Sequence, residues 1–339
     1  MTIVYPLLAV IALVLIAWIG TGVLGLGYLF GVVIPYLAIL IFIVGFIRKL
    51  VKWGKSAVPF RIPTTGGQMK SFPWIKSNWV DNPSNGFGVF LRMAFEILTF
   101  RSLFRNTKME YRQGPKVSYA SAKWLWIFAL LFHYSFLVIF IRHFRLFSEP
   151  VPYLITLIQD LDGFFQVGLP GVYITDALIL IGVGFLFFRR VSAPQIRYIS
   201  LAADYFPLFL IGGLAISGIL MRYFIRTDIA GVKELVLGLA SFHPTVPATI
   251  GSIFFIHLFL LSVLLAYFPF SKLTHMGGVF MSPTRNLANN NRFKHHVNPW
   301  NYPVHVHTYQ EYEDDFREKM VEAGLPVEKE LEAPAETEE

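Results

Sequence analysis

The sequence of 339 residues contains no cysteine. This absence excludes disulfides, zinc sites with cysteine ligands, iron–sulfur clusters held by this chain and covalent attachment of c-type haem. Any electron carrier in the protein is therefore a non-covalent cofactor held by other ligands.

Charged residues are also scarce, at 15% of the chain, whereas soluble domains carry about a quarter. Hydrophobic residues make up 55%, and the mean hydropathy is +0.54. Several stretches of about 18 or more residues contain no Asp, Glu, Lys or Arg, enough for a helix to cross a hydrocarbon core of about 30 Å. The alternating pattern of a membrane β-barrel is not found. The sequence therefore predicts an all-α integral membrane helical bundle.

We expect six transmembrane helices. The N-terminus has no basic segment and carries Pro6, so the first apolar stretch is expected to be a span and not a cleaved signal peptide. The predicted spans are residues 3–24, 28–48, 122–143, 171–189, 201–222 and 250–270. The predicted regions are an N-terminal transmembrane hairpin (1–50), a basic loop (51–119), a four-helix core (120–290) and a tail (291–339).

The distribution of basic residues predicts the orientation. Residues 51–119 contain eleven Lys or Arg against three acids, whereas residues 146–188 contain no Lys or Arg. The net charge of +7 is therefore explained by membrane topology and not by nucleic-acid binding. The positive-inside rule places the basic loop and both termini in the cytoplasm, for a multi-pass protein of the inner (cytoplasmic) membrane. Four arginines fall on the outer side against this trend: Arg142, Arg145, Arg222 and Arg226.

Three segments outside the spans have recognisable patterns. Residues 89–104 form an amphipathic pattern, which fits a helix on the membrane surface, a helix that docks a partner, or a plain connecting helix. Residues 309–320 predict a short charged helix. Residues 328–339 predict a disordered acidic tail.

Four histidines lie within or beside the predicted spans: His133, His143, His257 and His275. Ionisable side chains in a membrane are costly and usually functional, and two neutral imidazoles make the axial ligands of an electron-transfer haem. The alternative is that each histidine merely hydrogen-bonds to a neighbouring helix. Two histidines on each of two spans favour haem.

The spacing of these histidines predicts how they pair. Ten residues separate the first two and eighteen the last two, so each set falls on one broad helix face. Because the third and sixth spans run in opposite directions, His143 should face His257 towards the outside and His133 should face His275 towards the inside. Ten residues rise about 15 Å and eighteen about 27 Å, so Pro269 must kink or end the sixth helix to bring both pairs level.

The outer arginines fit an outer haem, whose propionates carry negative charge. Arg142, Arg145, Arg222 and Arg226 are candidate partners for these carboxylates; the alternative is interfacial snorkelling.

These residues resemble a known family. The segments Phe132–His143 (FHYSFLVIFIRH), Ile256–Leu258 (IHL), Phe268–His275 (FPFSKLTH) and Arg189–Pro194 (RRVSAP) are similar to the respiratory nitrate reductase gamma subunit family, over roughly residues 120–290. The resemblance implies a cytochrome b with two b haems held in the crossed pairing given above.

The remainder of the chain resembles a narrower group. The extra N-terminal span, the basic loop and the tail segments Asn298–Pro303 (NPWNYP) and His307–Glu313 (HTYQEYE) look like the cytochrome b subunits of the Dsr membrane complexes, the DsrM group, of sulfate-reducing and sulfur-oxidising microbes. This resemblance implies a quinol-oxidising electron-transfer subunit of an oxidoreductase complex. It would oxidise menaquinol near the outer haem and pass electrons to a cytoplasmic iron–sulfur subunit related to heterodisulfide reductase, in sulfite reduction. The alternatives are a nitrate reductase gamma subunit and a haem-free transporter or scaffold.

The sequence departs from the family at the quinol site. The nitrate reductase relatives carry a lysine implicated in quinol binding before the fourth span, and residues 146–188 have none here. The candidates to accept or bond quinol hydroxyl protons are Gln159, Asp160, Asp162 and His243, each of which also fits as an ordinary polar loop residue. Four further histidines, His295, His296, His305 and His307, lie in the tail; a surface for a partner fits them better than a metal site.

Overall fold

The computed structural model describes residues 2–56, 58, 67–105, 107–112, 114, 116–163, 171–294 and 303–329. The chain divides into two compact units, Met1–Phe293 and Lys294–Glu339. The predicted disordered tail, 328–339, lies outside the described residues except for Glu328 and Lys329.

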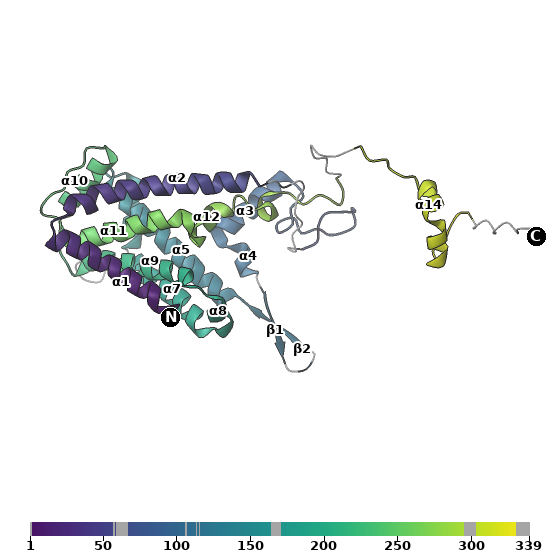
Figure 1. Cartoon of the computed structure of the whole chain (residues 1–339), viewed down its shortest axis with the longest axis horizontal. Helices are drawn as coiled ribbons and strands as arrows, with labels where there is room; N and C mark the ends of the chain where they lie inside the picture. Colours follow the sequence, from purple (N-terminus) through teal and green to yellow (C-terminus); the bar gives the residue numbers. More distant parts are fainter. Residues whose placement is uncertain are drawn as a thin grey trace, which may run out of the picture. The chain divides into compact units, whose positions relative to one another are not determined.

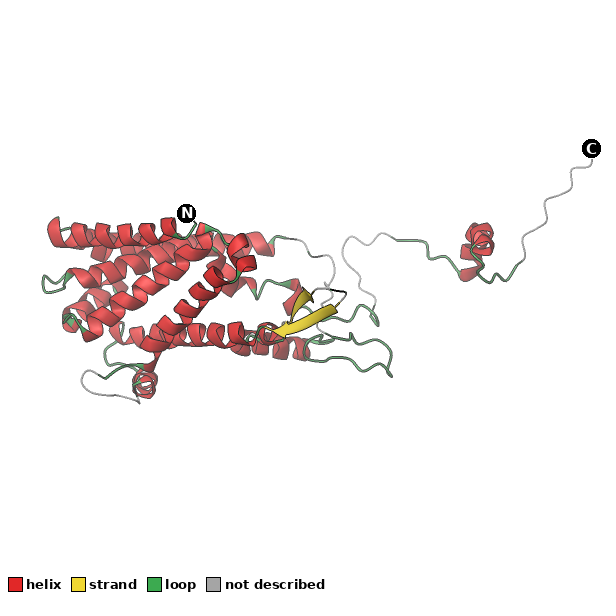
Figure 2. Ribbon diagram, turned by 90° about the horizontal axis from the view of Figure 1, so that it is seen from below, coloured by secondary structure: helices red, strands yellow, loops and turns green. Residues whose placement is uncertain are grey.

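The first unit is a bundle of long helices, which run side by side in Figures 1 and 2. Its long elements are α1 (Val4–Trp18) continued by the π-helix Ile19–Val23, the π-helix Leu29–Val33 continued by α2 (Ile34–Gly54), α5 (Lys123–His143) with the 3₁₀ turn Phe144–Leu146, α7 (Ile174–Ser192), α9 (Ala202–Tyr223) and α11 (Ser252–Tyr267). The shorter elements are α3 (Gly86–Thr99), α4 (Arg101–Phe104), β1 (Thr107–Arg112), β2 (Lys116–Ser121), α6 (Tyr153–Asp162), α8 (Pro194–Ile199), α10 (Ile229–Ala240), the 3₁₀ turns Phe268–Phe270 and Lys272–Thr274, α12 (His275–Gly278) and α13 (Pro283–Asn286).

In the part of the chain that the structure describes, five helices are long and apolar enough to cross a membrane: Val4–Val23, Leu29–Gly54, Lys123–Leu146, Ala202–Tyr223 and Ser252–Phe270. They match five of the six predicted spans to within a few residues. The remaining prediction, 171–189, corresponds to α7, which begins at Ile174 and carries three charged residues in its 19. Asp176 near its start and Arg189 and Arg190 near its end keep α7 from meeting the same standard.

Contacts among the long helices define the core. Helix α11 packs against α1, α2 and α9, while α7 packs against α5 and α9. Leu210, Leu235 and Leu260 are completely buried there. Many large apolar side chains on the outer faces of the spans are exposed in the bare chain, as expected for helices whose solvent is lipid.

A β-hairpin interrupts the predicted all-α organisation. Strands β1 and β2 pair antiparallel, from Thr107 opposite Ser121 to Arg112 opposite Lys116. The turn contains Gly114 with φ +84°, a conformation that favours glycine. The described chain is mostly helical, as predicted, and the hairpin lies largely in the segment 51–119 that was predicted as a basic loop.

Helix α3 overlaps the predicted amphipathic segment 89–104. Its polar side faces the protein and its apolar side is exposed. Phe87 and Phe90 are 70% and 66% exposed, whereas Arg92 is only 6% exposed. At the other end of the helix, Phe100 takes a left-handed conformation with φ 49° and reverses the chain into α4.

The sixth predicted span is broken at Pro269, as the histidine spacing requires. The α-helix ends at Tyr267, a 3₁₀ turn runs from Phe268 to Phe270, and Ser271 is extended before the chain turns again. Gly45 of α2 packs on the break, because a Cβ atom there would lie 2.8 Å from the Cβ of Pro269.

Gly45→Val should therefore force α2 and the Pro269 turn apart. Overpacking of this kind costs about 1–3 kcal/mol, so we expect a lower melting temperature for the purified protein in detergent. Gly184→Val is the matched control, since a Cβ atom on Gly184 would meet nothing within 4 Å. Equal melting temperatures for the two variants would contradict this packing.

The second unit contains α14 (Tyr309–Glu322), close to the predicted charged helix at 309–320. Thr308 and Glu311 form a capping box at its start. Glu313 accepts the backbone N–H groups of Glu328 at 2.8 Å and Lys329 at 2.9 Å. This carboxylate therefore ties the segment after α14 back onto the helix.

Protonation of Glu313 should release that segment. The N–H of Glu328, then that of Lys329 and the guanidinium of Arg317, lower the pKa of Glu313 from its ordinary value. A lowered folded pKa gives a stabilisation that is complete above the ordinary pKa of a glutamate and is lost as pH falls through the folded value. Hydrogen exchange at the Glu328 and Lys329 amides, corrected for its intrinsic pH dependence, should lose protection on acidification. Glu313→Gln should lack that protection already at neutral pH.

Candidate functional site

The four intramembrane histidines form two facing pairs. His133 of α5 lies opposite His275, the first residue of α12, with ring centres 6.0 Å apart and planes at 87°. His143 at the end of α5 lies opposite His257 of α11, with ring centres 6.2 Å apart and planes at 9°. The structure thus brings together the two pairs that the ten- and eighteen-residue spacings select.

The hydrogen bonds of these rings set their protonation. Nδ1 lies 2.7 Å from a backbone carbonyl oxygen in His133 and His143, and 2.9 Å from one in His275. A carbonyl only accepts, so Nδ1 carries the proton in each. Nδ1 of His257 lies 2.9 Å from Oγ of Ser217, which itself donates to the Leu214 carbonyl. All four rings therefore keep Nε2 as the nitrogen with a free lone pair, the form a metal requires.

The separation of the rings fits one metal ion between each pair. A metal–imidazole nitrogen bond is about 2 Å long, so two rings on opposite sides of one ion have centres about 6 Å apart. Helix α5 carries one histidine of each pair, and neither α11, with His257, nor α12, with His275, is among the helices that pack closely against it in the described chain. The donor set, its protonation and its spacing therefore suit a haem iron with two axial histidines.

Neighbouring residues shape the two pairs differently. The rings of Phe100 and Phe132 meet His133 edge-on, each with centres 5.0 Å apart. At the other pair Gly218 lies against His257, where a Cβ atom would come to ordinary van der Waals distance, 3.4 Å, from Cε1 of the ring. Ser217 thus orients His257 from the facing helix α9, and Gly218 lies beside it.

A buried charge network lies beside His143. The guanidinium of Arg142 donates to Asp162 and, at 3.2 Å, to Asp176. Asp162 also accepts the N–H and hydroxyl of Thr175, at 2.9 and 2.6 Å. The hydroxyl of Tyr223 donates to Asp176 at 2.8 Å. Arg142, a candidate for the propionates, is thus held by two aspartates, and Asp162, a quinol candidate, already has its oxygens occupied.

Tyr173 lies between two of the outer arginines. The guanidinium carbons of Arg142 and Arg222 lie 3.7 and 3.8 Å from its ring centre, which places them on opposite faces. Cations stacked on an aromatic face are stabilised by the ring quadrupole. Arg222 also donates to the Gly171 carbonyl at 3.3 Å.

The other quinol candidates lie on accessible surface. Arg145 donates to Oε1 of Gln159 at 2.6 Å. Asp160 is exposed on α6, and so is His243 in the loop after α10, where its Nδ1 lies 2.8 Å from the Ser241 carbonyl. Arg226 is also exposed.

The tail histidines divide into two sets. Ligand atoms of His305, His307 and Glu311 lie within 4.8 Å of one another, and all three residues are exposed. Glu311 is already used by the capping box of α14, which leaves an incomplete metal site. His295 and His296 lie outside the described residues.

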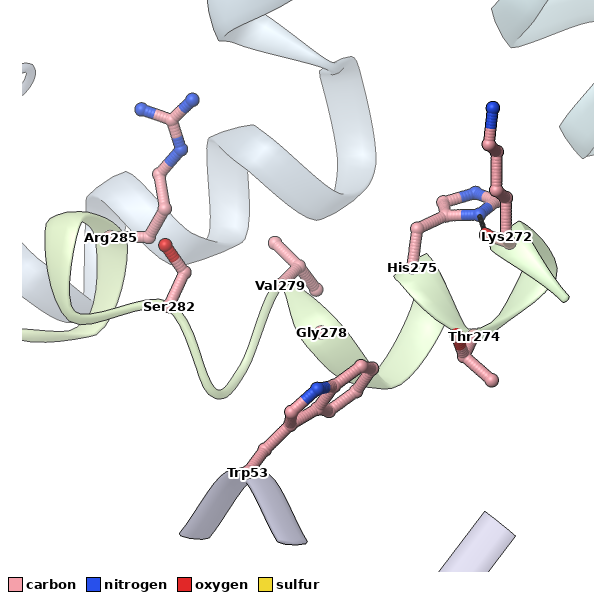
Figure 3. A pocket seen from close by; sticks show the side chains of 8 residues that line it. All are labelled: Trp53, Lys272, Thr274, His275, Gly278, Val279, Ser282 and Arg285. Atoms are coloured by element: carbon pink, nitrogen blue, oxygen red, sulfur yellow. Dashed lines mark hydrogen bonds between the residues drawn. The ribbon is translucent and has the colours of Figure 1, made fainter. Parts of the chain in front are cut away.

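A cavity of about 570 Å³ opens beside His275. Figure 3 shows its lining, with the side chains of Lys272, His275, Val279 and Arg285 on one side and those of Trp53 and Thr274 on the other. Lys272 donates to Asp204 at 2.6 Å.

The chain is similar to a family of known proteins. The family model of the nitrate reductase gamma subunit matches residues 86–291, most of the first unit. The chain belongs to this family. Its relatives include the cytochrome b-like subunit of the Hdr-like menaquinol oxidoreductase of Archaeoglobus fulgidus. That relative is 46% identical over 282 residues, covering 81% of this chain and 84% of the relative.

Two further relatives extend the range of the family. The corresponding subunit of Archaeoglobus profundus is 42% identical over 274 residues, covering 79% of this chain and 81% of the relative. One component of the dihydromethanophenazine:CoB–CoM heterodisulfide reductase of Methanosarcina thermophila is 24% identical over 267 residues, covering 76% of this chain and 90% of the relative. Together with the apolar helices, family membership makes the chain a multi-pass membrane protein.

Several residues around the site were not expected from the sequence. Tyr173, Tyr223 and Thr175 enter the outer network through hydrogen bonds or stacking, and Ser217 orients His257. The sequence offers one clue for Ser217, a hydroxyl directly before Gly218 within an apolar span. The tyrosines lie at span ends, where aromatic residues are common whatever their role.

Proposed function

We propose that this chain is the dihaem cytochrome b subunit of a quinol-oxidising membrane complex. The observation that carries the proposal is the two pairs of facing imidazoles along α5, one at its middle and one at its C-terminal end, with ring centres 6.0 and 6.2 Å apart. His133 and His275 would hold one b haem, and His143 and His257 the other, through Nε2. Bound haem supplies reversible one-electron chemistry, which connects a two-electron quinol to an iron–sulfur partner.

Six spans and a fixed orientation complete this proposal. Helix α7 crosses the membrane as a fourth span of the core, with Asp176 satisfied internally by Arg142 and Tyr223. Charged residues inside a membrane are tolerated where they pair within the bundle. The excess of basic residues in the 51–119 loop keeps both termini in the cytoplasm of a cell with an inner membrane.

Menaquinol oxidation belongs at the outer end of the bundle. A quinol that becomes a quinone releases two electrons and two protons, and the protons need acceptors there. Asp160 and His243 are exposed bases at that end, and the amide nitrogen of Gln159 can bond a quinol oxygen. Asp162 is less suited to this role because Arg142 and Thr175 already occupy it. Arg145 and Arg222 remain cations for the propionates of the outer haem.

The electron acceptor is a cytoplasmic iron–sulfur subunit related to heterodisulfide reductase. Relatives at 42–46% identity carry Hdr-like menaquinol oxidoreductase names, and the tail resembles that of the Dsr cytochrome b subunits. We assign the complex to dissimilatory sulfur metabolism on this basis.

Reduced-minus-oxidised spectra of the purified protein test the proposal. We expect a b-type α band, two haems per chain, and reduction by a menaquinol analogue. A protein without that band would be a haem-free transporter or scaffold. Co-purification of a molybdenum-containing subunit would assign the chain to a nitrate reductase instead of a Dsr-type complex.

A further inference from the structure

Two arginines near the inner histidine pair share one carboxylate. Nε of Arg285 lies 3.7 Å from Oε1 of Glu96. Oε2 of Glu96 is already used by the N–H and hydroxyl of Ser102, at 3.0 and 2.5 Å. Arg92 lies one turn before Glu96 on α3 and is only 6% exposed. Among the described residues, Glu96 is thus the acid close to both guanidinium groups.

The guanidinium of Arg92 has an N–H group without a hydrogen-bond acceptor among the described residues. This nitrogen, Nη1, is buried. Burial, followed by the nearby charge of Arg285, lowers the pKa of Arg92, so the two cations are close enough to repel each other. A buried guanidinium with an unused N–H and a cationic neighbour calls for an anion.

The cavity beside His275 supplies the place for that anion. Arg285 and His275 line the same cavity of about 570 Å³, and their side chains lie on the same side of it in Figure 3. Phe100, at the end of the helix that carries Arg92, meets the ring of His133. Arg285 therefore adjoins the inner histidine pair through the cavity, and Arg92, which does not line the cavity, is linked to it through Arg285 and Glu96.

We propose that Arg92 and Arg285 bind the propionate carboxylates of the haem held by His133 and His275. The inference rests on the proposed function, because it needs a haem at this pair. A planar guanidinium pairs bidentately with a carboxylate. Two propionates would more than offset the single positive charge that the two arginines and Glu96 leave together. These arginines would thereby hold the inner haem in one orientation and set its potential.

The test uses the complete protein with haem labelled with ¹³C at its propionate carboxyls. Arg92→Gln and Arg285→Gln should lower the midpoint potential of the haem that His275→Ala removes, because a lost positive charge favours the oxidised form. The labelled carboxylate bands in reduced-minus-oxidised infrared spectra should shift in both variants. Arg92→Lys, which keeps the charge, should stay close to the wild-type potential. Arg101→Gln is the matched control, since Arg101 pairs with Asp81 at 2.8 Å.

The outcomes separate this inference from the proposed function. Two bound haems with unchanged inner potential and unchanged labelled bands in both glutamine variants would overturn the inference and leave the dihaem function intact. A shifted potential with unmoved labelled bands would also overturn it, because the anion would then be a lipid or partner group. Loss of the inner haem in Arg92→Gln but not in Arg92→Lys would support it. A wild-type protein without haem would remove the proposed function itself.

Discussion

Replacing His275 by alanine should remove one of two haems and leave the other with its spectrum and potential intact. The reason is geometric: His275 faces only His133, 6.0 Å away, while His143 and His257 form a separate pair. A haem with one axial histidine lost has no second ligand to hold it in a six-coordinate state. We expect His133→Ala to remove the same haem, and His143→Ala or His257→Ala to remove the other.

Two measurements test this prediction. The pyridine haemochrome assay gives the number of haems per chain, and a redox titration of each variant gives the potential of the haem that remains. The double variant His143→Ala/His275→Ala should bind no haem. His243→Ala is the matched control, because His243 is exposed and belongs to neither pair. Loss of both haems from every single variant, or retention of both, would leave the pairing without support.

The pairing of the four histidines was predictable because it depends only on the periodicity and rise of the helices that carry them. Helix α5 is continuous from Lys123 to His143, so helical periodicity relates its two histidines directly. The break at Pro269 was also predictable, since proline interrupts a helix and the rise between His257 and His275 is otherwise too large. Local rules fix both features.

The surrounding charges were not open to prediction in the same way. Arg142 is expected near propionates from its position beside His143, yet it pairs with Asp162 and Asp176, 20 and 34 residues further along. Which carboxylate reaches a guanidinium depends on how loops fold back onto the bundle. The hairpin was missed although the sequence carries its signals: Met109 and Tyr111, and Val117 and Tyr119, alternate with polar residues, and Gly114-Pro115 marks the turn.

Helix α3 is a second feature whose contacts the sequence does not reveal. The sequence shows an amphipathic helix but not which side faces the protein. The structure buries Arg92 and exposes Phe87 and Phe90, the reverse of a soluble amphipathic helix. An outward apolar face suits a helix at the membrane interface, and the buried arginine is then free to serve the inner histidine pair.

Arg142→Met should be the most destabilising substitution at the outer end. It leaves Asp162 and Asp176 buried without their shared cation, and removing one partner of a buried ion pair costs about 3–5 kcal/mol. We expect a large fall in the melting temperature in detergent and loss of the haem at His143 and His257, since Arg142 adjoins His143. Arg145→Met, three residues along, is the matched control for the melting temperature alone, because Arg145 is a proposed propionate partner of the same haem. Arg145 is exposed and donates to Gln159, so its loss should cost about 0–1 kcal/mol.

Neutralising the two aspartates separates the contribution of the Arg142 charge to stability from the contribution of its packing. In Arg142→Met the cost comes from two uncompensated carboxylates, so Arg142→Met/Asp162→Asn/Asp176→Asn should recover part of the lost stability. Measured together with Asp162→Asn/Asp176→Asn in the wild-type background, the triple variant gives the coupling free energy between Arg142 and the two aspartates. If the triple variant were less stable, packing of the arginine against Tyr173 at 3.7 Å, and not its charge, would hold the outer end together.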